Sequence, residues 1–247
     1  MRKGIIRDFL ITLGFMTRLG PVIDIEAKDL ARTVKWMPLS GLVLGSVIVC
    51  PFYLGLFADK FWIQAWLSVG ASVYLTRGLH FDGIADIADG AGPYPDAVRF
   101  WEIIKDSRSG VFGILASVIV LLGQVVCFYY IFEAHAYAAA IWIFIVGRMG
   151  CSAMCRIGRP FSRPGQGVLF MDGADWPSLA VAFISTILTG FLAVNIQTQI
   201  TAYVLGGGSL LFLFRLAKKV NGANGDFLGG AVVLAEISGL LAFAALN

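Results

Sequence analysis

Apolar stretches of about twenty residues recur along this chain, and each is long enough to cross a bilayer as an α-helix. We expect seven such spans, at residues 36–57, 61–79, 111–132, 137–157, 177–196, 200–216 and 227–246. Inside lipid, only helices and closed barrels satisfy all of their backbone hydrogen bonds. The sequence therefore predicts an all-α, polytopic integral membrane protein.

Composition supports this interpretation. The 247 residues are 58% hydrophobic and 14% charged, whereas a soluble domain has roughly 25% charged residues. We expect one helical membrane domain over residues 1–247, with an N-terminal segment at 1–35 and a transmembrane bundle at 36–247. The sixth span is the shortest and contains three consecutive glycines, at 206–208.

The N-terminal segment has the pattern of an amphipathic helix at residues 4–18. Ile5, Phe9, Leu13 and Met16 fall on one stripe, and Arg7 lies off it with Asp8 and Arg18. This pattern predicts an interfacial helix that lies on the membrane surface. Because Arg7 and Asp8 interrupt the apolar run early, we do not expect a cleavable signal peptide.

The basic residues predict the orientation in the membrane. If seven spans alternate, eighteen of the nineteen Lys and Arg residues fall on one side, and only Lys60 falls on the other. The positive-inside rule makes the first side cytoplasmic. The outer loops are short and carry no group suited to chemistry, so we expect a site that faces the cytoplasm from the inner (cytoplasmic) cell membrane.

One stretch carries three carboxylates directly after the second span. Asp82, Asp86 and Asp89 are spaced i, i+4 and i+7, which places them within about 60° of one another on a helix. Hard oxygen ligands of this kind favour Mg²⁺, with Mn²⁺ as an alternative. The other interpretation is a solvated helix end with scattered acids. Gly83 and Gly90 would let another group come close.

His80 stands two residues before Asp82. On a continuous helix it would point nearly opposite to the carboxylates, so it joins them only if the helix begins or bends near Gly83. Two interpretations stay open: a contact to substrate or a proton relay, and a structural histidine that forms hydrogen bonds.

A second polar group, at residues 105–110, precedes the third span. Ser107 or Ser109 could cap the helix that follows. Arg108 is unusual there, because a helix N-terminus disfavours a cation; an anionic ligand held by both Arg108 and the backbone amides would remove the conflict. We therefore assign Ser107 and Arg108 to phosphate binding and Asp106 to metal binding or proton transfer.

The third and fourth groups are loops. Residues 156–167 hold Arg156, Arg159 and Arg163 among prolines and glycines, which indicates either a lipid-headgroup anchor or a clamp on an anionic substrate. Residues 221–226 contain two Asn-Gly pairs and favour a tight turn; we place Asn224 and Asp226 among the substrate-binding residues. Glu236, inside the last span, needs a partner such as Arg77 or Arg148.

Carboxylates that hold a metal, beside cations suited to phosphate, predict a phosphoryl-transfer site. No P-loop or kinase signature is present, so hydrolysis of a free nucleotide is not indicated. A membrane enzyme that joins two phosphate-bearing molecules fits better. A cation transporter is the alternative from another class, but its acids should lie near the midplane of the membrane. We expect contact with membrane lipid and none with nucleic acid; the sequence does not set the oligomeric state.

The acidic stretch from His80 to Gly90, together with Asp106-Ser107-Arg108-Ser-Gly110 and Gly225-Asp226-Phe-Leu-Gly229, resembles the cobalamin synthase family. Similar likenesses occur at residues 15–19 and 38–45. The resemblance covers nearly the whole chain, in order, and the acidic string is its most specific part.

The resemblance implies a membrane-bound, Mg²⁺-dependent transferase of late cobalamin synthesis. Its substrates would be a corrinoid nucleotide, adenosylcobinamide-GDP, and α-ribazole or its 5′-phosphate. Asp82, Asp86, Asp89 and Asp106 would hold the metal, and one of them, with Asp89 preferred, would accept the proton. Arg108, with Arg18, Arg159 and Arg163, would bind phosphates.

The enzyme alternative is a CDP-alcohol phosphotransferase acting on lipid. That signature has Asp-Gly-x₂-Ala-Arg, and here Ala85 is followed by Asp86. The sequence therefore favours the cobalamin synthase family.

Overall fold

The computed structural model describes residues 4–92, 96–106 and 108–247, and these residues form helices with no β-strand among them. Six of the described helices are long and apolar enough to cross a membrane. They are α3 (Met37–Tyr53, which continues a 3₁₀ turn at Val34–Trp36), α7 (Val111–Glu133), α8 (Tyr137–Gly158), α10 (Trp176–Ala193), α11 (Ile196–Lys219) and α12 (Gly225–Leu246). The prediction of an all-α, polytopic membrane protein is confirmed.

Several span boundaries differ from the predictions by three or four residues; α3 ends at Tyr53 rather than 57, and α10 at Ala193 rather than 196. α4 (Phe61–Leu75) has 15 residues, about 22 Å against a hydrocarbon core of about 30 Å. It ends before the predicted residue 79 because Arg77 and Gly78 adopt left-handed φ angles of 59° and 70°. α11, by contrast, has 24 residues and runs through the three glycines. The count of seven spans stays a prediction.

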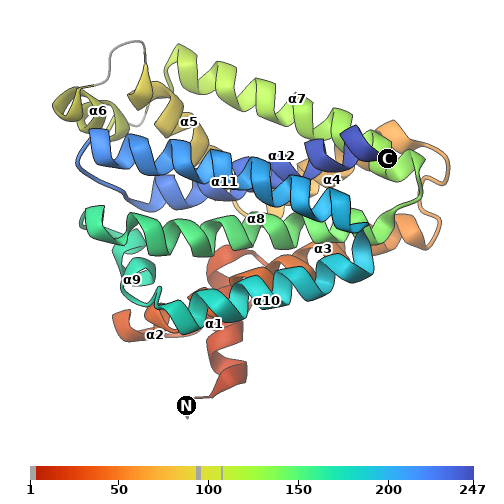
Figure 1. Ribbon diagram of the computed structural model, residues 1–247, viewed down its shortest axis with the longest axis horizontal. Coiled ribbons are helices and arrows are strands. Elements are labelled where there is room, and N and C mark those ends of the chain that lie inside the picture. The colour runs from red at the N-terminus through yellow and green to blue at the C-terminus, as the bar shows by residue number, and fades with distance from the viewer. Residues whose placement is uncertain (1–3, 93–95, 107) are drawn as a thin grey trace.

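The bundle is built around α8 and α12, which pack against each other (Figure 1). α3 and α10 also pack against α8, and α5 (Leu79–Ala91) and α11 pack against α12. The outer helices present apolar side chains to the surroundings: Ile119 on α7 is 67% exposed and Leu192 on α10 is 85% exposed. Such surfaces suit contact with lipid tails.

A buried ion pair joins the two central helices. Arg148 on α8 donates from Nη1 to Oε1 of Glu236 on α12, and Gln124 on α7 donates to Oε2 of Glu236 at 3.1 Å. Of the two partners that the sequence left open for Glu236, the structure selects Arg148. Arg77 instead donates to backbone carbonyls near the end of α1 (Ile5–Met16), among them that of Gly14 at 2.6 Å.

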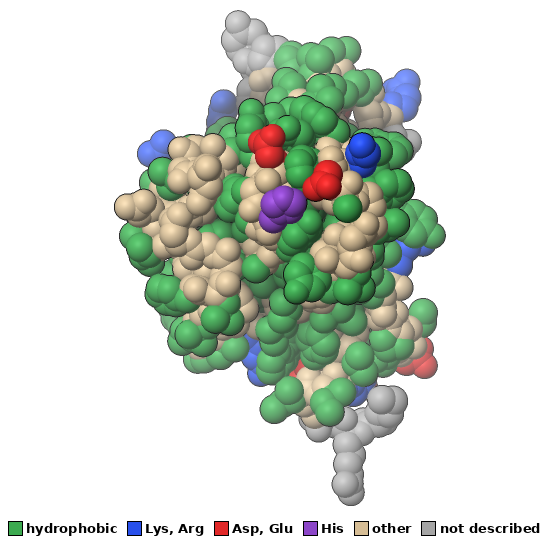
Figure 2. All heavy atoms as spheres, turned by 90° about the vertical axis from the view of Figure 1, so that its right-hand side faces the viewer, with side chains coloured by type: hydrophobic (Ala, Val, Ile, Leu, Met, Phe, Trp, Pro, Cys, Tyr) green, Lys and Arg blue, Asp and Glu red, His purple; other side chains and the backbone are tan. Residues whose placement is uncertain are grey.

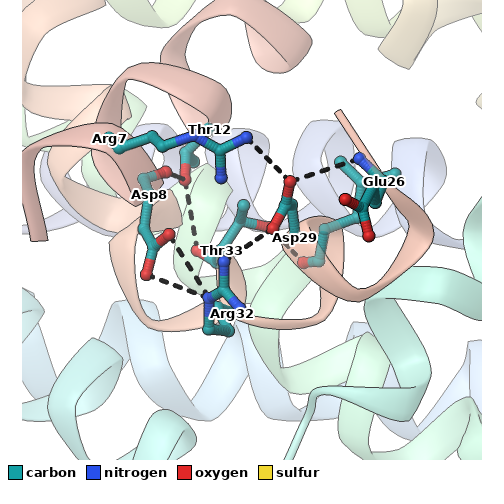
Figure 3. Close-up of polar contacts among 8 residues, drawn as sticks. Arg7, Asp8, Thr12, Glu26, Asp29, Arg32 and Thr33 are labelled. Atoms are coloured by element: carbon teal, nitrogen blue, oxygen red, sulfur yellow. Dashed lines mark hydrogen bonds and ion pairs between the residues drawn. The ribbon is translucent and has the colours of Figure 1, made fainter. Parts of the chain in front are cut away.

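Ion pairs tie the N-terminal segment together (Figure 3). Asp29 on α2 (Ala27–Ala31) accepts from Arg7 at 2.8 Å and from Arg32 at 2.6 Å, and Asp8 lies 3.4 Å from Arg32. Asp8 is buried because of this network, whereas Ile5 on the predicted apolar stripe is 69% exposed. The prediction that α1 lies on a membrane surface stays a prediction.

Polar side chains gather at one end of the bundle. α5, α6 (Ala97–Ile104), α9 (Gln166–Asp172) and the loop from α11 to α12 lie together at the left of Figure 1. The other end carries the C-terminus and the loops at residues 54–60, 134–136 and 194–195, and Figure 2 shows that few charged side chains lie on it. A site with ionic chemistry therefore belongs to the first end.

Candidate functional site

The site is built where α5 crosses the first turn of α12. A Cβ atom added at Gly83 would lie only 2.7 Å from the backbone oxygen of Asp226, and one at Gly229 would lie 3.1 Å from that of Leu79. Glycine at both positions therefore lets the two helices touch. This contact places Asp226 directly beside the carboxylates of α5.

We call Asp82, Asp86, Asp89 and Asp226 the acidic ridge. α5 is one continuous helix, so its three carboxylates share a face, as their spacing predicts. Partial burial and, after it, charge repulsion from Asp226, Asp82 and Asp89 together raise the pKa of Asp86 to about 7. The ridge therefore holds more negative charge than its surroundings neutralise, and a bound cation would relieve it.

The carboxylates of the ridge suit Mg²⁺ better than a metal ion that takes all of its ligands from the protein. Among the residues that the structure describes, no three His, Cys, Asp or Glu side chains converge as a preformed metal site. Mg²⁺ is usually held by one or two carboxylates, with water and substrate phosphates completing its octahedron. Asp82 and Asp86 could supply those carboxylates, with Asp226 and Asp89 beside them.

Asp89 has a structural partner as well. Its Oδ2 accepts from the backbone N–H of Gly110 at 2.7 Å, and its Oδ1 accepts from that of Gly113 at 2.7 Å. The N-terminus of α7, where the sequence predicted a phosphate contact, thus carries a carboxylate of the chain itself. Each oxygen keeps a further lone pair for another contact.

Asp106 and Arg108 pair with each other in this structure. Asp106 forms a two-point ion pair with Arg108, with contacts of 2.8 and 3.1 Å, which lowers the pKa of Asp106 to about 2. Asp106 is not among the charges that shift Asp86. The predicted phosphate contact Ser107 lies outside the described residues.

Beside the ridge lies a cavity of about 320 Å³ that brings together several predicted residues. His80, Asn224 and Asp226 line it, as do Gly165 and Gly167 of the cationic loop. Asn224 caps α12 by accepting from the backbone N–H of Asp226 at 3.2 Å, and its amide donates to the Asp226 carboxylate at 2.6 Å. Asn224 thus fixes the orientation of Asp226, which borders both the ridge and the cavity.

His80 does not join the α5 carboxylates, because the helix neither begins nor bends at Gly83. It is 5% exposed and lines the cavity instead. Burial lowers the pKa of His80 well below its usual value, and the cation of Arg148 lowers it further. The imidazole is therefore neutral at physiological pH.

The cationic loop, at residues 156–167, is hydrogen-bonded to the loop before α12. The Arg163 backbone N–H donates to the carbonyl of Ala223 at 2.9 Å, and the Ala223 N–H donates to that of Phe161 at 2.7 Å. The Arg163 guanidinium lies 4.2 Å from the ring centre of Trp101 on α6. Arg159 is exposed. This arrangement keeps cations at the same end of the bundle as the ridge.

Arg18 lies elsewhere. Its Nε donates to the carbonyl of Tyr74 at 2.9 Å, and its guanidinium lies 5.0 Å from the Tyr74 ring centre. The structure therefore places it against the end of α4, without a contact to the acidic ridge.

Sequence reasoning missed the apolar wall of the cavity. Phe15, Met37, Cys151 and Phe170 come from four different helices, α1, α3, α8 and α9. No local spacing relates them, so no pattern could have grouped them. The glycines of residues 156–167 were one signal, because a Cβ at Gly167 would lie 2.7 Å from the backbone nitrogen of Gly225.

Fold and site together define a multi-pass helical membrane protein with an acidic site at one end of its bundle. The family model described as cobalamin-5-phosphate synthase matches residues 8–244, and the chain belongs to this family.

Similar proteins carry the name adenosylcobinamide-GDP ribazoletransferase. The one from Nitratidesulfovibrio vulgaris (strain DP4) is 40% identical over 233 residues, which covers 94% of this chain and 95% of that protein. The one from Chlorobaculum parvum is 31% identical, with 88% and 87% covered. The one from Thermoanaerobacter pseudethanolicus is 27% identical, with 98% of both chains covered. No solved structure matches the chain.

Proposed function

We propose that this chain transfers the cobinamide phosphate of adenosylcobinamide-GDP to α-ribazole, or to α-ribazole 5′-phosphate, in a reaction that depends on Mg²⁺. Family membership and the names of the relatives support the reaction. The observation that carries the assignment to this site is the position of Asp226, which lies beside Asp82 and Asp86 and also lines the cavity.

The transfer replaces one phosphorus–oxygen bond by another. A ribose hydroxyl oxygen of the acceptor attacks the cobinamide-side phosphorus of the pyrophosphate. The bond from that phosphorus to the bridging oxygen breaks, GMP leaves with the bridging oxygen, and the hydroxyl proton passes to a base. The product is adenosylcobalamin, or its 5′-phosphate.

Bound Mg²⁺ would neutralise the pyrophosphate and the charge that develops on the leaving GMP. Asp82 and Asp86 are the carboxylates we assign to hold it, because burial and repulsion from its like-charged neighbours disfavour the ionised form of Asp86 without a cation. Asp89 fixes the start of α7 against α5 and adds its remaining lone pairs to the same face. Asp106 would join them as a ligand only by leaving Arg108.

Asp226 replaces Asp89 as the base in this proposal, because both oxygens of Asp89 accept hydrogen bonds from backbone amides of α7. It borders the cavity, and Asn224 holds its carboxylate in place. Positioned general bases typically contribute a factor of about 10² to 10⁴ to rate. The cations Arg108, Arg159 and Arg163 lie at the same end of the bundle as the ridge and would bind phosphates, whereas Arg18 would reach them only by leaving Tyr74. We place this end in the cytoplasm, at the inner cell membrane.

Product analysis tests the reaction. Purified protein in detergent is incubated with adenosylcobinamide-GDP, α-ribazole and Mg²⁺, and corrinoids and nucleotides are separated by chromatography. We expect one GMP for each cobalamin formed, and no product from CDP-diacylglycerol. Release of GMP without cobalamin, or turnover of CDP-diacylglycerol alone, would reject the proposal.

A further inference from the structure

His80 lines the cavity beside the ridge and carries two buried polar atoms without a partner among the described residues. Its side chain is 5% exposed, and neither Nδ1 nor Nε2 has a hydrogen-bond partner among the described residues. A buried polar group without a partner costs free energy, and such groups are rare in folded proteins. Both nitrogens are covered in this structure; because His80 lines the cavity, a turn of its imidazole would let a ligand in the cavity supply the missing hydrogen bond.

The rest of the lining is largely apolar. Phe15 and Phe170 form an edge-to-face pair with ring centres 4.6 Å apart, and Met37 and Cys151 are almost fully buried beside them. Among the described residues that line the cavity, none is Lys or Arg. An apolar lining with a few polar groups is typical of a site that binds a flat organic ring rather than a phosphate.

The volume and the lining of the cavity indicate which part of the two substrates it can hold. The cavity volume of about 320 Å³ lies at the small end of ligand pockets, and a corrin ring with its amide side chains is far too large for it. A guanine base fits by size, but its edge carries several donors and acceptors that Phe15, Met37 and Phe170 would leave unpaired. A methylated benzimidazole has no such edge.

We propose that the cavity binds the flat, apolar base of the acceptor nucleoside, and that His80 hydrogen-bonds to its ribose. This inference rests on the proposed function for the identity of the acceptor. It places the ribose between His80 and Asp226, which both line the cavity. The attacking hydroxyl then lies close both to Asp226, the proton acceptor, and to the other carboxylates of the ridge. Positioning of this kind lowers the barrier of a two-substrate reaction.

Binding of α-ribazole to the purified protein, measured by calorimetry in EDTA, tests the cavity without turnover. Cys151→Phe fills the cavity, and Cys50→Phe on the exposed face of α3 is the matched control. We expect Cys151→Phe to weaken α-ribazole binding about tenfold or more, and Cys50→Phe to leave it within about twofold. GMP should not compete with α-ribazole for the wild-type protein. Competition by GMP, or unchanged binding in Cys151→Phe, would overturn the inference.

His80 gives a second route that does not depend on how Cys151→Phe folds. His80→Phe should raise the KM for α-ribazole about tenfold and leave the KM for adenosylcobinamide-GDP unchanged, while His80→Gln should keep most of the affinity. A rise in the KM for adenosylcobinamide-GDP alone would assign the cavity to the guanosine half and reject our inference. If no cobalamin forms at all, the proposed function fails, and the calorimetry still decides whether the cavity binds the nucleoside.

Discussion

The carboxylate of Asp89 on α5 and the backbone amide of Gly113 on α7 are joined by a hydrogen bond of 2.7 Å, and a Cβ atom on Gly113 would overlap that carboxylate. Gly110 binds the other oxygen at the same distance. The first turn of α7 has unpaired amides and a partial positive charge, which a carboxylate satisfies. α5 and α7 are therefore held together at the ridge itself.

Replacing Gly113 by Ala should separate the two helices at this point. The added methyl group displaces the Asp89 carboxylate, so we expect a loss of about 1–3 kcal/mol in unfolding free energy and a larger loss of transferase activity. Thermal unfolding in detergent and initial rates measure the two effects. Gly123→Ala on the same helix is the control, because its new Cβ would meet only the Ile237 side chain at 3.4 Å.

Asp89→Asn tests the same contact from the carboxylate side. An amide keeps one acceptor and loses the charge, so stability should fall by less than in Asp89→Ala, where both amides lose their partner. Equal stability of wild type and Asp89→Ala would show that this contact does not hold α7.

The raised pKa of Asp86 in the ridge predicts how the stability of the folded protein depends on pH. The folded-state pKa of Asp86 is about 7, above its ordinary value of 3.8. Between these values the folded protein binds more protons than the unfolded chain, so without metal the Tm should fall as the pH rises from about 4 to about 7. Asp86→Asn removes the titrating group, and its Tm should change less over the same range.

Mg²⁺ should reverse that loss. Protons compete for the same oxygens, so saturating Mg²⁺ should raise the Tm by about 5–10 °C at pH 8 and by less at pH 5.5. Asp96→Asn, which keeps the cap of α6, is the matched control and should respond like the wild type. An equal response of Asp86→Asn to Mg²⁺ at pH 8 would contradict the assignment.

The buried pair of Arg148 and Glu236 should matter for stability more than any exposed pair. Glu236→Ala leaves Arg148 buried without its countercharge, which typically costs about 3–5 kcal/mol. Arg148→Met combined with Glu236→Leu should recover much of that loss, because no unpaired charge remains. Glu102→Ala on the exposed face of α6 is the control, and thermal unfolding in detergent is the measurement. A double variant less stable than Glu236→Ala would contradict this account.

Local pattern was enough to predict most of the helices. Runs such as 111–132 and 227–246 carry few breakers, and their lengths match the bilayer. The second span ends earlier than predicted because Arg77 and Gly78 adopt left-handed φ angles and turn the chain. A hydropathy pattern does not reveal such a turn. The three carboxylates on α5 follow from i, i+4 and i+7 spacing alone.

The tertiary part of the site could not be predicted in the same way. Asp226 joins the ridge because α5 and α12 cross at Gly83, and Asp89 binds α7 because α5 packs against α7. Both contacts link segments distant in sequence, and neither leaves a periodic signal. Gly83 was noted as a place of close approach, but the sequence could not say which segment approaches.

The central claim is that the acidic ridge binds a divalent cation, and Mn²⁺ binding followed by electron paramagnetic resonance tests it most directly. The free Mn²⁺ signal should fall as the wild-type protein is added, and Mg²⁺ should restore it by competition. Asp82→Asn combined with Asp86→Asn should abolish the loss of signal, whereas Asp96→Asn should behave like the wild type. Undiminished Mn²⁺ binding by the double variant would contradict the account.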